Sequence, residues 1–357
     1  MATVKTDKNS LNEALEEEKN TIDKVVHVRY IILSLVLSLS GLALVFYYTY
    51  TPGMLAQLEL NRMPGLIIAL VISILRVWFS AAKFRFLSEK QLSWAASFRI
   101  VLVWDFTSAV SPTTVGGAPM ALYAMGKESL SLGKATAITL YGVLLDQIWF
   151  ALAIPVLLIS GIYFDVVPEN AGWVGESLMI FIYVALLVYS SLLAYSVLIN
   201  PKILRIAVKK IFSLPILKKY KSKVESQSEE LEATANELRK KPFSFILYAF
   251  FLSSMSWMAR IAIPVSIILS FGNSDVFLSF LRSFALHLAG LFIPTPGGAG
   301  GFEGLFALFM GTIMPRKGFI ALAIFMWRFI GYYVSIGLGA WGAMWYINKK
   351  VEQKINK

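Results

Sequence analysis

Long hydrophobic runs, separated by short polar or charged connections, dominate the pattern of this sequence. Several runs exceed the roughly 20 residues that a helix needs to cross a bilayer. A membrane β-barrel would instead show short segments that alternate between apolar and polar residues. The pattern predicts an all-α polytopic membrane protein with about six full spans. We place these spans at residues 30–50, 65–86, 135–162, 177–199, 243–270 and 318–346.

Two further apolar stretches, residues 98–125 and 279–314, contain residues that interrupt helices. The first carries PTTVGG at 112–117, and the second carries PTPGGAGGFE at 294–303. Proline and glycine both disfavour a continuous helix. Irregular backbone at membrane depth is tolerated only where protein or a water-filled cavity surrounds it. We therefore predict two re-entrant hairpins that break at 112–117 and 294–301 and line a site.

The two broken segments match each other at a constant offset of 182 positions, which predicts an internal duplication. Positions that fall together include Pro112 and Pro294, Thr113 and Thr295, Gly116 and Gly298, Ser97 and Ser279, Asp105 and His287, and Asp146 and Arg328. The agreement centres on the helix-breaking residues. Because three full crossings separate the breaks, the two halves are expected to have inverted topology, as in many secondary transporters.

Charge between the spans predicts the topology. Residues 200–242 carry eleven Lys and Arg against five Glu, and such basic connections lie on the cytoplasmic side. That placement requires residues 98–125 to re-enter. The expected order is a cytoplasmic tail (1–24), a first membrane half (25–199), a basic cytoplasmic connection (200–242), a second half (243–346) and a second cytoplasmic tail (347–357). Arg316 and Lys317 do not follow this charge rule, because the predicted topology places them on the non-cytoplasmic side. We expect a multi-pass protein of the cell membrane with both termini cytoplasmic.

Composition narrows the chemistry further. Hydrophobic residues make up 57% of the 357 residues and charged residues 15%, with a net charge of +11. In a membrane protein this basic charge is expected to contact anionic lipid headgroups rather than nucleic acid. Without cysteine there is no disulfide, thiol nucleophile or thiolate metal site. The two histidines, His27 and His287, lack metal-ligand spacing, so no metal or other cofactor is expected.

The ionisable residues inside the predicted membrane segments include three arginines and two aspartates. Arg76, Asp146, Arg260 and Arg328 each stand about 15 Å from the nearer end of their span, and Asp105 lies in the first broken segment. A charge at that depth costs at least about 2.5–3.5 kcal/mol and requires a partner or an aqueous cavity. We predict that the three arginines bind an anionic group such as a lipid phosphate. The alternative is a structural ion pair in which Asp105 or Asp146 neutralises an arginine.

The breaks supply further candidate substrate-binding residues: Thr113, Gly116, Gly117, Thr295, Gly297 and Gly298. Half-helices that begin after Gly117 and Gly301 would point unpaired N–H groups at the centre, which favours an anion. Alternatively, the two threonines bind backbone carbonyls that the breaks release.

Glu303 would lie in the first turn of the second half-helix, where the helix dipole stabilises a carboxylate. Its alternative role is proton coupling, with His287 as a companion that titrates near neutral pH. Asp105 and Asp146 would then either balance charge or carry protons. We assign this group of four residues to charge balance or proton coupling.

The motifs PTTVGG, GKATAITLYGVLLDQ and PTPGGAGGFEG resemble the flippase-like transmembrane domain of lysylphosphatidylglycerol synthases and its stand-alone relatives. The resemblance covers about residues 30–345 and implies a polytopic domain that moves aminoacylated or other anionic lipids between leaflets. We expect no aminoacyl-transferase domain, since the chain ends at Lys357. A second departure follows the first break, where many members place an acidic residue and an arginine. This chain has Ala118, Pro119, Met120 and Tyr123 there.

Together these features predict a lipid flippase or lipid transporter rather than an enzyme. The substrate would be an anionic or aminoacylated phospholipid, or a lipid-linked intermediate, that crosses through a midplane cavity. One alternative is an integral-membrane transferase with Glu303 and His287 as acid and base. Another is a non-transporting partner of a lipid-modifying enzyme. Expected partners are membrane lipids, with a second copy of the chain or a lipid-synthesising protein as further candidates.

Overall fold

The computed structural model describes residues 28–50, 52, 63–111, 117–128, 130–168, 172–200, 202–203, 206, 221–272 and 275–355. Within these ranges every regular element is helical, which confirms the all-α prediction. The predicted tail at 1–24, residues 356–357 of the predicted tail at 347–357, most of residues 201–220 of the connection at 200–242, and residues 112–116 of the first break lie outside the described residues. Thr113 and Gly116 are among these last residues.

The described part of the chain contains six segments that are long and apolar enough to cross a membrane, as predicted. The first five are α2 (Val28–Thr49), α3 (Met63–Leu87), α6 (Leu132–Ser160), α7 (Gly172–Ala194) with the π-helical η4 (Tyr195–Ile199), and α10 (Phe243–Ser270). The sixth is composite and consists of η7 (Lys317–Phe319), α13 (Ile320–Arg328), the π-helical η8 (Phe329–Tyr333) and α14 (Val334–Ile355).

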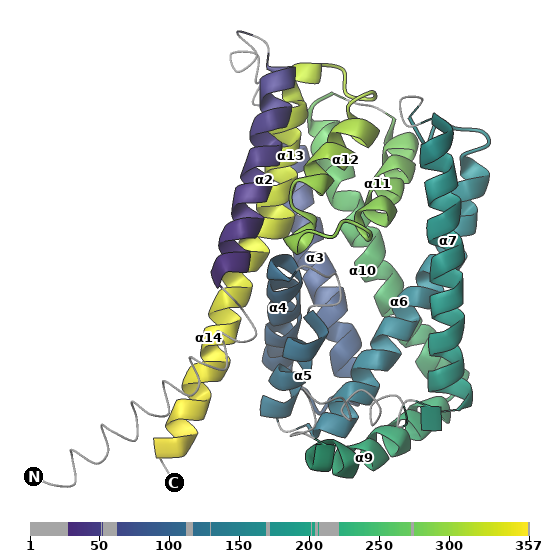
Figure 1. The fold of residues 1–357 in the computed structure, drawn as a ribbon, viewed down its shortest axis with the longest axis vertical. Helices are drawn as coiled ribbons and strands as arrows, with labels where there is room; N and C mark the ends of the chain where they lie inside the picture. Colours follow the sequence, from purple (N-terminus) through teal and green to yellow (C-terminus); the bar gives the residue numbers. More distant parts are fainter. Residues whose placement is uncertain are drawn as a thin grey trace, which may run out of the picture.

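Two pairs of shorter helices flank the glycine-rich interruptions. The first pair is α4 (Trp94–Val110) and α5 (Gly117–Lys127), and the second is α11 (Val276–Gly290) and α12 (Gly301–Met310), with the short η6 (Pro296–Gly298) between them. The helices of each pair pack against each other. Figure 1 shows α4 and α5 in the lower half of the molecule and α11 and α12 in the upper half. The second helices begin at Gly117 and Gly301, as the sequence predicts.

The first helices of the two pairs begin in the same way, 182 positions apart. Ser93 caps α4 by accepting a hydrogen bond from the Ala96 N–H at 3.1 Å. Asp275 caps α11 by accepting one from the Leu278 N–H at 2.9 Å. In the first turn of each helix a serine hydroxyl, that of Ser97 or Ser279, donates to the carbonyl of the capping residue. Local geometry thus repeats at the offset that the sequence motifs define.

The centre of the molecule is the interface between α3 and α10, the most extensive contact between described helices. The Ser80 and Ser256 hydroxyls share a hydrogen bond at 2.6 Å, and the Lys83 Nζ donates to the Ser253 Oγ at 3.4 Å. Residue numbers rise along α3 while those of their partners fall along α10. The two helices are therefore antiparallel, and a row of polar side chains runs along their interface.

Apolar side chains fill the space on either side of this interface in two clusters. One cluster joins residues of α3, α4, α5, α6, α9 and α14, around the first helix pair. The other joins residues of α6, α7, α10, α11, α12 and α13, around the second pair. Each pair of short helices thus has its own hydrophobic core, and the polar row of α3 and α10 lies between the cores.

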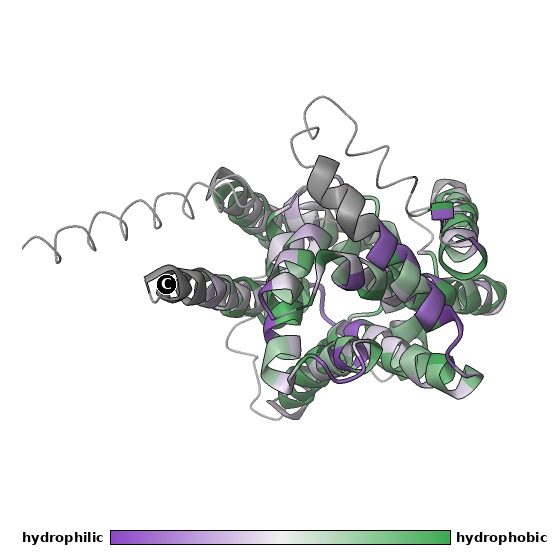
Figure 2. Ribbon diagram, turned by 90° about the horizontal axis from the view of Figure 1, so that it is seen from below, coloured by the Kyte–Doolittle hydropathy of each residue, from purple (hydrophilic) through white to green (hydrophobic). Residues whose placement is uncertain are grey.

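Helix α9 (Lys221–Arg239) lies within the predicted basic connection at 200–242. It packs against α6 at the lower end of the molecule. Figure 2, which shows the molecule from below, has hydrophilic residues at this end. Leu231, Ala235 and Leu238 are buried because their spacing of four and three residues places them on one helix face. The remaining faces are polar, which gives the segment its hydrophilic composition.

Candidate functional site

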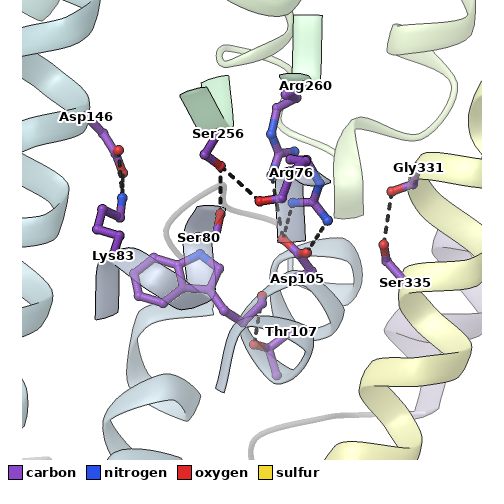
Figure 3. A network of polar contacts seen from close by, with 11 residues as sticks. Arg76, Ser80, Lys83, Asp105, Thr107, Asp146, Ser256, Arg260, Gly331 and Ser335 are labelled. Atoms are coloured by element: carbon purple, nitrogen blue, oxygen red, sulfur yellow. Dashed lines mark hydrogen bonds and ion pairs between the residues drawn. The ribbon is translucent and has the colours of Figure 1, made fainter. Parts of the chain in front are cut away.

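A cluster of three charged residues lies where α3, α4 and α10 meet (Figure 3); we call Arg76, Asp105 and Arg260 the central triad. Arg76 donates to Asp105 with both terminal nitrogens, Nη1 to Oδ1 at 3.3 Å and Nη2 to Oδ2 at 2.6 Å. Arg260 approaches the same carboxylate from α10, with 3.6 Å between its Nη2 and Oδ1. One carboxylate thus faces two guanidinium groups.

The two arginines of the triad differ in accessibility. The Arg76 side chain is 4% exposed, whereas that of Arg260 is 40% exposed. Arg260 stands about 15 Å from the nearer end of its helix, and α10 is the most buried of the six candidate spans. Since a guanidinium facing lipid at that depth would be costly, we infer that the exposed part of Arg260 faces an interior space. Its guanidinium also lies 5.3 Å from the ring centre of Trp257.

A second ion pair lies further along the same polar row. The Lys83 Nζ donates to both carboxylate oxygens of Asp146 on α6, at 2.8 and 3.0 Å. Ser253 of α10 also donates to Asp146. With its contact to Ser253, the ammonium group has acceptors for all three of its protons. The structural alternative, an aspartate that neutralises an arginine, is therefore found for Asp105 with Arg76, whereas Asp146 is neutralised by a lysine.

The second break is held by a third ion pair. Arg328 donates to Glu303 from Nε and from Nη2, both at 2.9 Å. It also donates to the backbone carbonyls of Gly297 at 3.3 Å and Gly298 at 3.2 Å. The Glu303 side chain is 0% exposed and that of Arg328 is 6% exposed. The pair thus fastens the glycine-rich segment to α12 and α13.

Helix α2 and the π-helical turn η8 complete this environment. Ser38 of α2 donates to Glu303 and shares a hydrogen bond of 3.0 Å with the Tyr333 hydroxyl. Tyr332 donates to the carbonyl of Ala109 at 3.3 Å, near the end of α4. Because α4 also packs against η6, the second break lies against the residues that lead into the first. Single π-helical turns are frequent at functional sites.

The residues of the second break have mainly structural contacts. Thr295 donates to the carbonyl of Ala299 at 2.8 Å, as its alternative role predicted. Gly297 and Gly298 have φ values of 59° and 65°, a region that glycine adopts readily. A Cβ on Gly297 would lie 2.6 Å from the Ala109 carbonyl oxygen and 2.4 Å from the Tyr332 ring. Glycine therefore permits the close approach of the two segments.

The remaining predicted residues are placed as follows. Glu303 lies in the first turn of α12, as expected. The His287 Nδ1 is paired with the Ser283 carbonyl at 2.7 Å, and its ring contacts the rings of Phe302 and Trp327. Gly117 begins α5. Their proposed substrate or proton-coupling roles stay predictions.

Two buried cations, Lys83 and Arg282, were not among the site residues predicted from the sequence. Lys83 lies inside α3, near the end of the predicted span at 65–86. Arg282 of α11 is 4% exposed, and it donates to the carbonyls of Asp165 at 2.8 Å and Phe309 at 3.1 Å. It also donates to the Thr312 hydroxyl. A basic residue in the middle of an apolar run was the available signal for Arg282.

The three clusters allow different chemistry. In the Lys83 and Arg328 clusters, each cation is matched by its own carboxylate. In the central triad, two cations share one carboxylate, and one of them is accessible. An anionic ligand is the group that this arrangement can accept. Among the described residues, no group of three or more His, Asp or Glu side chains gathers as a metal site would require.

Six apolar helices around a buried polar row define a polytopic membrane protein with a charged interior. The chain belongs to the family described as the lysylphosphatidylglycerol synthase TM region, whose model matches residues 31–339. It is also similar to a UPF0104 membrane protein from Archaeoglobus fulgidus, with 24% identity over 314 residues, 86% of this chain and 94% of the relative. No solved structure matches the chain.

Proposed function

We propose that this protein is a lipid transporter that moves an anionic lipid, or a lipid-linked intermediate, between the two leaflets of the cell membrane. The headgroup would cross the midplane at the central triad while the acyl chains remain in the bilayer. The family is that of the lysylphosphatidylglycerol synthase TM region, and lysylphosphatidylglycerol is a lipid, which supports a lipid as the ligand.

The observation that carries this proposal is the state of Arg260. Its side chain is 40% exposed on the most buried span, and among the described residues its one polar contact is Asp105 at 3.6 Å. A guanidinium has five N–H donors in a planar fork that matches two phosphate oxygens. Most of these donors are therefore available to a headgroup that enters the interior.

Arg76 and Arg328 are less suited to this role than the sequence suggested. Each makes a bidentate ion pair with a carboxylate and is at least 94% buried. Removing either from its carboxylate would leave an uncompensated charge in the protein interior, which is strongly unfavourable. We therefore propose that Arg260 contacts the headgroup directly, and that Arg76 and Arg328 maintain the surrounding structure.

We further propose that the two halves are inverted repeats and that the short helix pairs are re-entrant hairpins. Three observations support this arrangement: the antiparallel contact of α3 with α10, the matching caps of α4 and α11, and the opposite halves of Figure 1 that the pairs occupy. Transporters with this plan bind substrate near the midplane, between the repeats.

This topology places α9 in the cytoplasm. Because the chain has no cysteine, a single cysteine at Glu229 can be labelled without background. We expect a membrane-impermeant maleimide to label the Glu229→Cys variant only after intact cells are opened. Labelling of intact cells would contradict the proposed orientation.

The proposed function is tested by reconstituting the purified protein into vesicles that contain a panel of fluorescent lipids. We expect leaflet exchange of at least one anionic lipid above the rate of protein-free vesicles. The Arg260→Gln variant should abolish that exchange, Arg260→Lys should retain part of it, and Arg239→Gln on α9 should behave as the unchanged protein. Exchange unaffected by Arg260→Gln, or no exchange of any lipid, would overturn the proposal. Mass spectrometry of the lipids would reveal a new chemical species if the protein were a transferase.

A further inference from the structure

We infer that Asp105 sets the charge of the headgroup that the central triad accepts, and that this charge is a single negative one, as in a phosphodiester. This inference rests on the proposed function and specifies its substrate class. It assigns Asp105 as a positioning and specificity-determining residue, which differs from a role in proton coupling.

The first step is the charge balance of the triad. Arg76 and Arg260 together carry two positive charges, and Asp105 carries one negative charge. Their contacts of 2.6 Å and 3.6 Å with the carboxylate make the three residues one electrostatic unit. This unit has one uncompensated positive charge at the middle of the membrane.

The neighbouring ion pairs do not compensate this surplus positive charge. Asp146 is neutralised by Lys83 at 2.8 Å and Glu303 by Arg328 at 2.9 Å. Each of these pairs is neutral and fully hydrogen-bonded, so neither carboxylate is available to balance Arg260. Arg282, in the middle of α11, has carbonyl and hydroxyl acceptors in place of a carboxylate contact.

The third step is the cost of charge in a membrane interior. An uncompensated charge at that depth is expensive, whereas a paired one is tolerated. A headgroup with one negative charge makes the triad neutral. A phosphomonoester carries about −1.5 to −2 at pH 7, so it would leave a negative surplus. A zwitterionic headgroup would leave the positive surplus in place.

The geometry of Asp105 fits this role. Its two oxygens accept a bidentate pair from Arg76, which fixes the orientation of the carboxylate. One of these oxygens lies 3.6 Å from Arg260, close enough to hold the guanidinium electrostatically but without a short hydrogen bond. Asp105 can therefore orient Arg260 and limit the local charge, while the planar N–H groups of Arg260 stay free for phosphate oxygens.

The test compares two labelled lipids with identical acyl chains in the reconstituted protein. Phosphatidylmethanol is a phosphodiester with one negative charge, and phosphatidic acid is the corresponding phosphomonoester. We expect the unchanged protein to exchange phosphatidylmethanol at least about tenfold faster, a preference equivalent to about 1.4 kcal/mol. Equal exchange of both lipids would overturn the inference. If the protein exchanges no lipid at all, the proposed function itself is overturned.

Two variants distinguish the effect of the Asp105 charge on lipid preference from a role of Asp105 in maintaining the fold. Asp105→Asn raises the triad charge to two and should shift the preference towards phosphatidic acid. The double variant Arg76→Gln/Asp105→Asn returns the charge to one and should restore the preference for phosphatidylmethanol. If Asp105 only maintains the fold, Asp105→Asn will slow both lipids by the same factor and the double variant will not restore selectivity. If a variant fails to fold, the preference of the unchanged protein still tests whether the accepted headgroup carries a single negative charge.

Discussion

The central triad and the pair of Arg328 with Glu303 use the same side-chain chemistry in two different states. In both, a guanidinium donates two hydrogen bonds to a carboxylate inside the protein. At the second break the carboxylate is 0% exposed and meets one arginine, whereas in the triad it meets two. The difference leaves Arg260 with fewer short contacts than Arg328, because the carboxylate that faces Arg260 is already engaged by Arg76.

The surroundings of the two sites reinforce this contrast. Arg328 also binds the carbonyls of Gly297 and Gly298, and Glu303 also accepts from Ser38. Every strong donor and acceptor at the second break therefore has a partner. Arg260 has a distant ion contact and an aromatic neighbour, Trp257. We accordingly expect changes at the second break to affect stability, and changes at Arg260 to affect transport.

The largest effect on stability is expected from Glu303→Gln. This variant leaves Arg328 buried without a counter-charge, and breaking such a pair typically costs about 3–5 kcal/mol. Reversible unfolding in mixed detergent micelles measures the change in the free energy of unfolding. The double variant Glu303→Gln/Arg328→Gln removes the buried charge and should recover part of the loss. A loss below about 1 kcal/mol, the value of an exposed pair, would show that the pair is solvated.

Gly297→Ala should have the next largest effect. A residue with a Cβ is strained at a φ of 59°, and the added carbon would collide with the Ala109 carbonyl oxygen. Left-handed strain and overpacking each cost about 1–3 kcal/mol. Gly331→Ala is the matched control, since a Cβ there meets nothing within 4 Å. Equal stability of the two variants in the same unfolding assay would contradict the close approach of η6 and α4.

Ser38→Ala should have the smallest effect. It removes one donor to Glu303 but leaves both hydrogen bonds from Arg328, so a loss of about 1 kcal/mol is expected. Thr49→Ala is a suitable control, because Thr49 donates to the Val45 carbonyl within the same helix. If Ser38→Ala is as damaging as Glu303→Gln, helix α2 contributes more to holding the second break than the ion pair does.

The sequence was sufficient to predict much of the helical organisation. Apolar runs located the six spans, and the glycine-rich motifs located the helix starts at Gly117 and Gly301. These features depend on local composition and backbone chemistry, which can be read along the chain. The average composition of the basic connection did not reveal the buried face of α9 at Leu231, Ala235 and Leu238.

The pairing of charges was harder to predict. Lys83 lies near the end of a predicted span, where a basic residue serves as a topology signal in many proteins. Its ion pair with Asp146 depends on how α3 and α6 pack, which the sequence pattern does not specify. The same limit applies to the three arginines, which looked equivalent in the sequence. Packing leaves Arg260 accessible and buries Arg76 and Arg328.

The most direct measurement concerns access to position 260. Since the chain lacks cysteine, single-cysteine variants can be treated in vesicles with a small, charged, water-soluble methanethiosulfonate reagent. We expect Arg260→Cys to react, because the side chain faces a polar interior space. Leu70→Cys on the outer surface of α3 and Ser38→Cys in the buried environment of Glu303 should not react. An unreactive Arg260→Cys, alongside a reactive Glu89→Cys at the exposed end of α3, would contradict the accessible central triad.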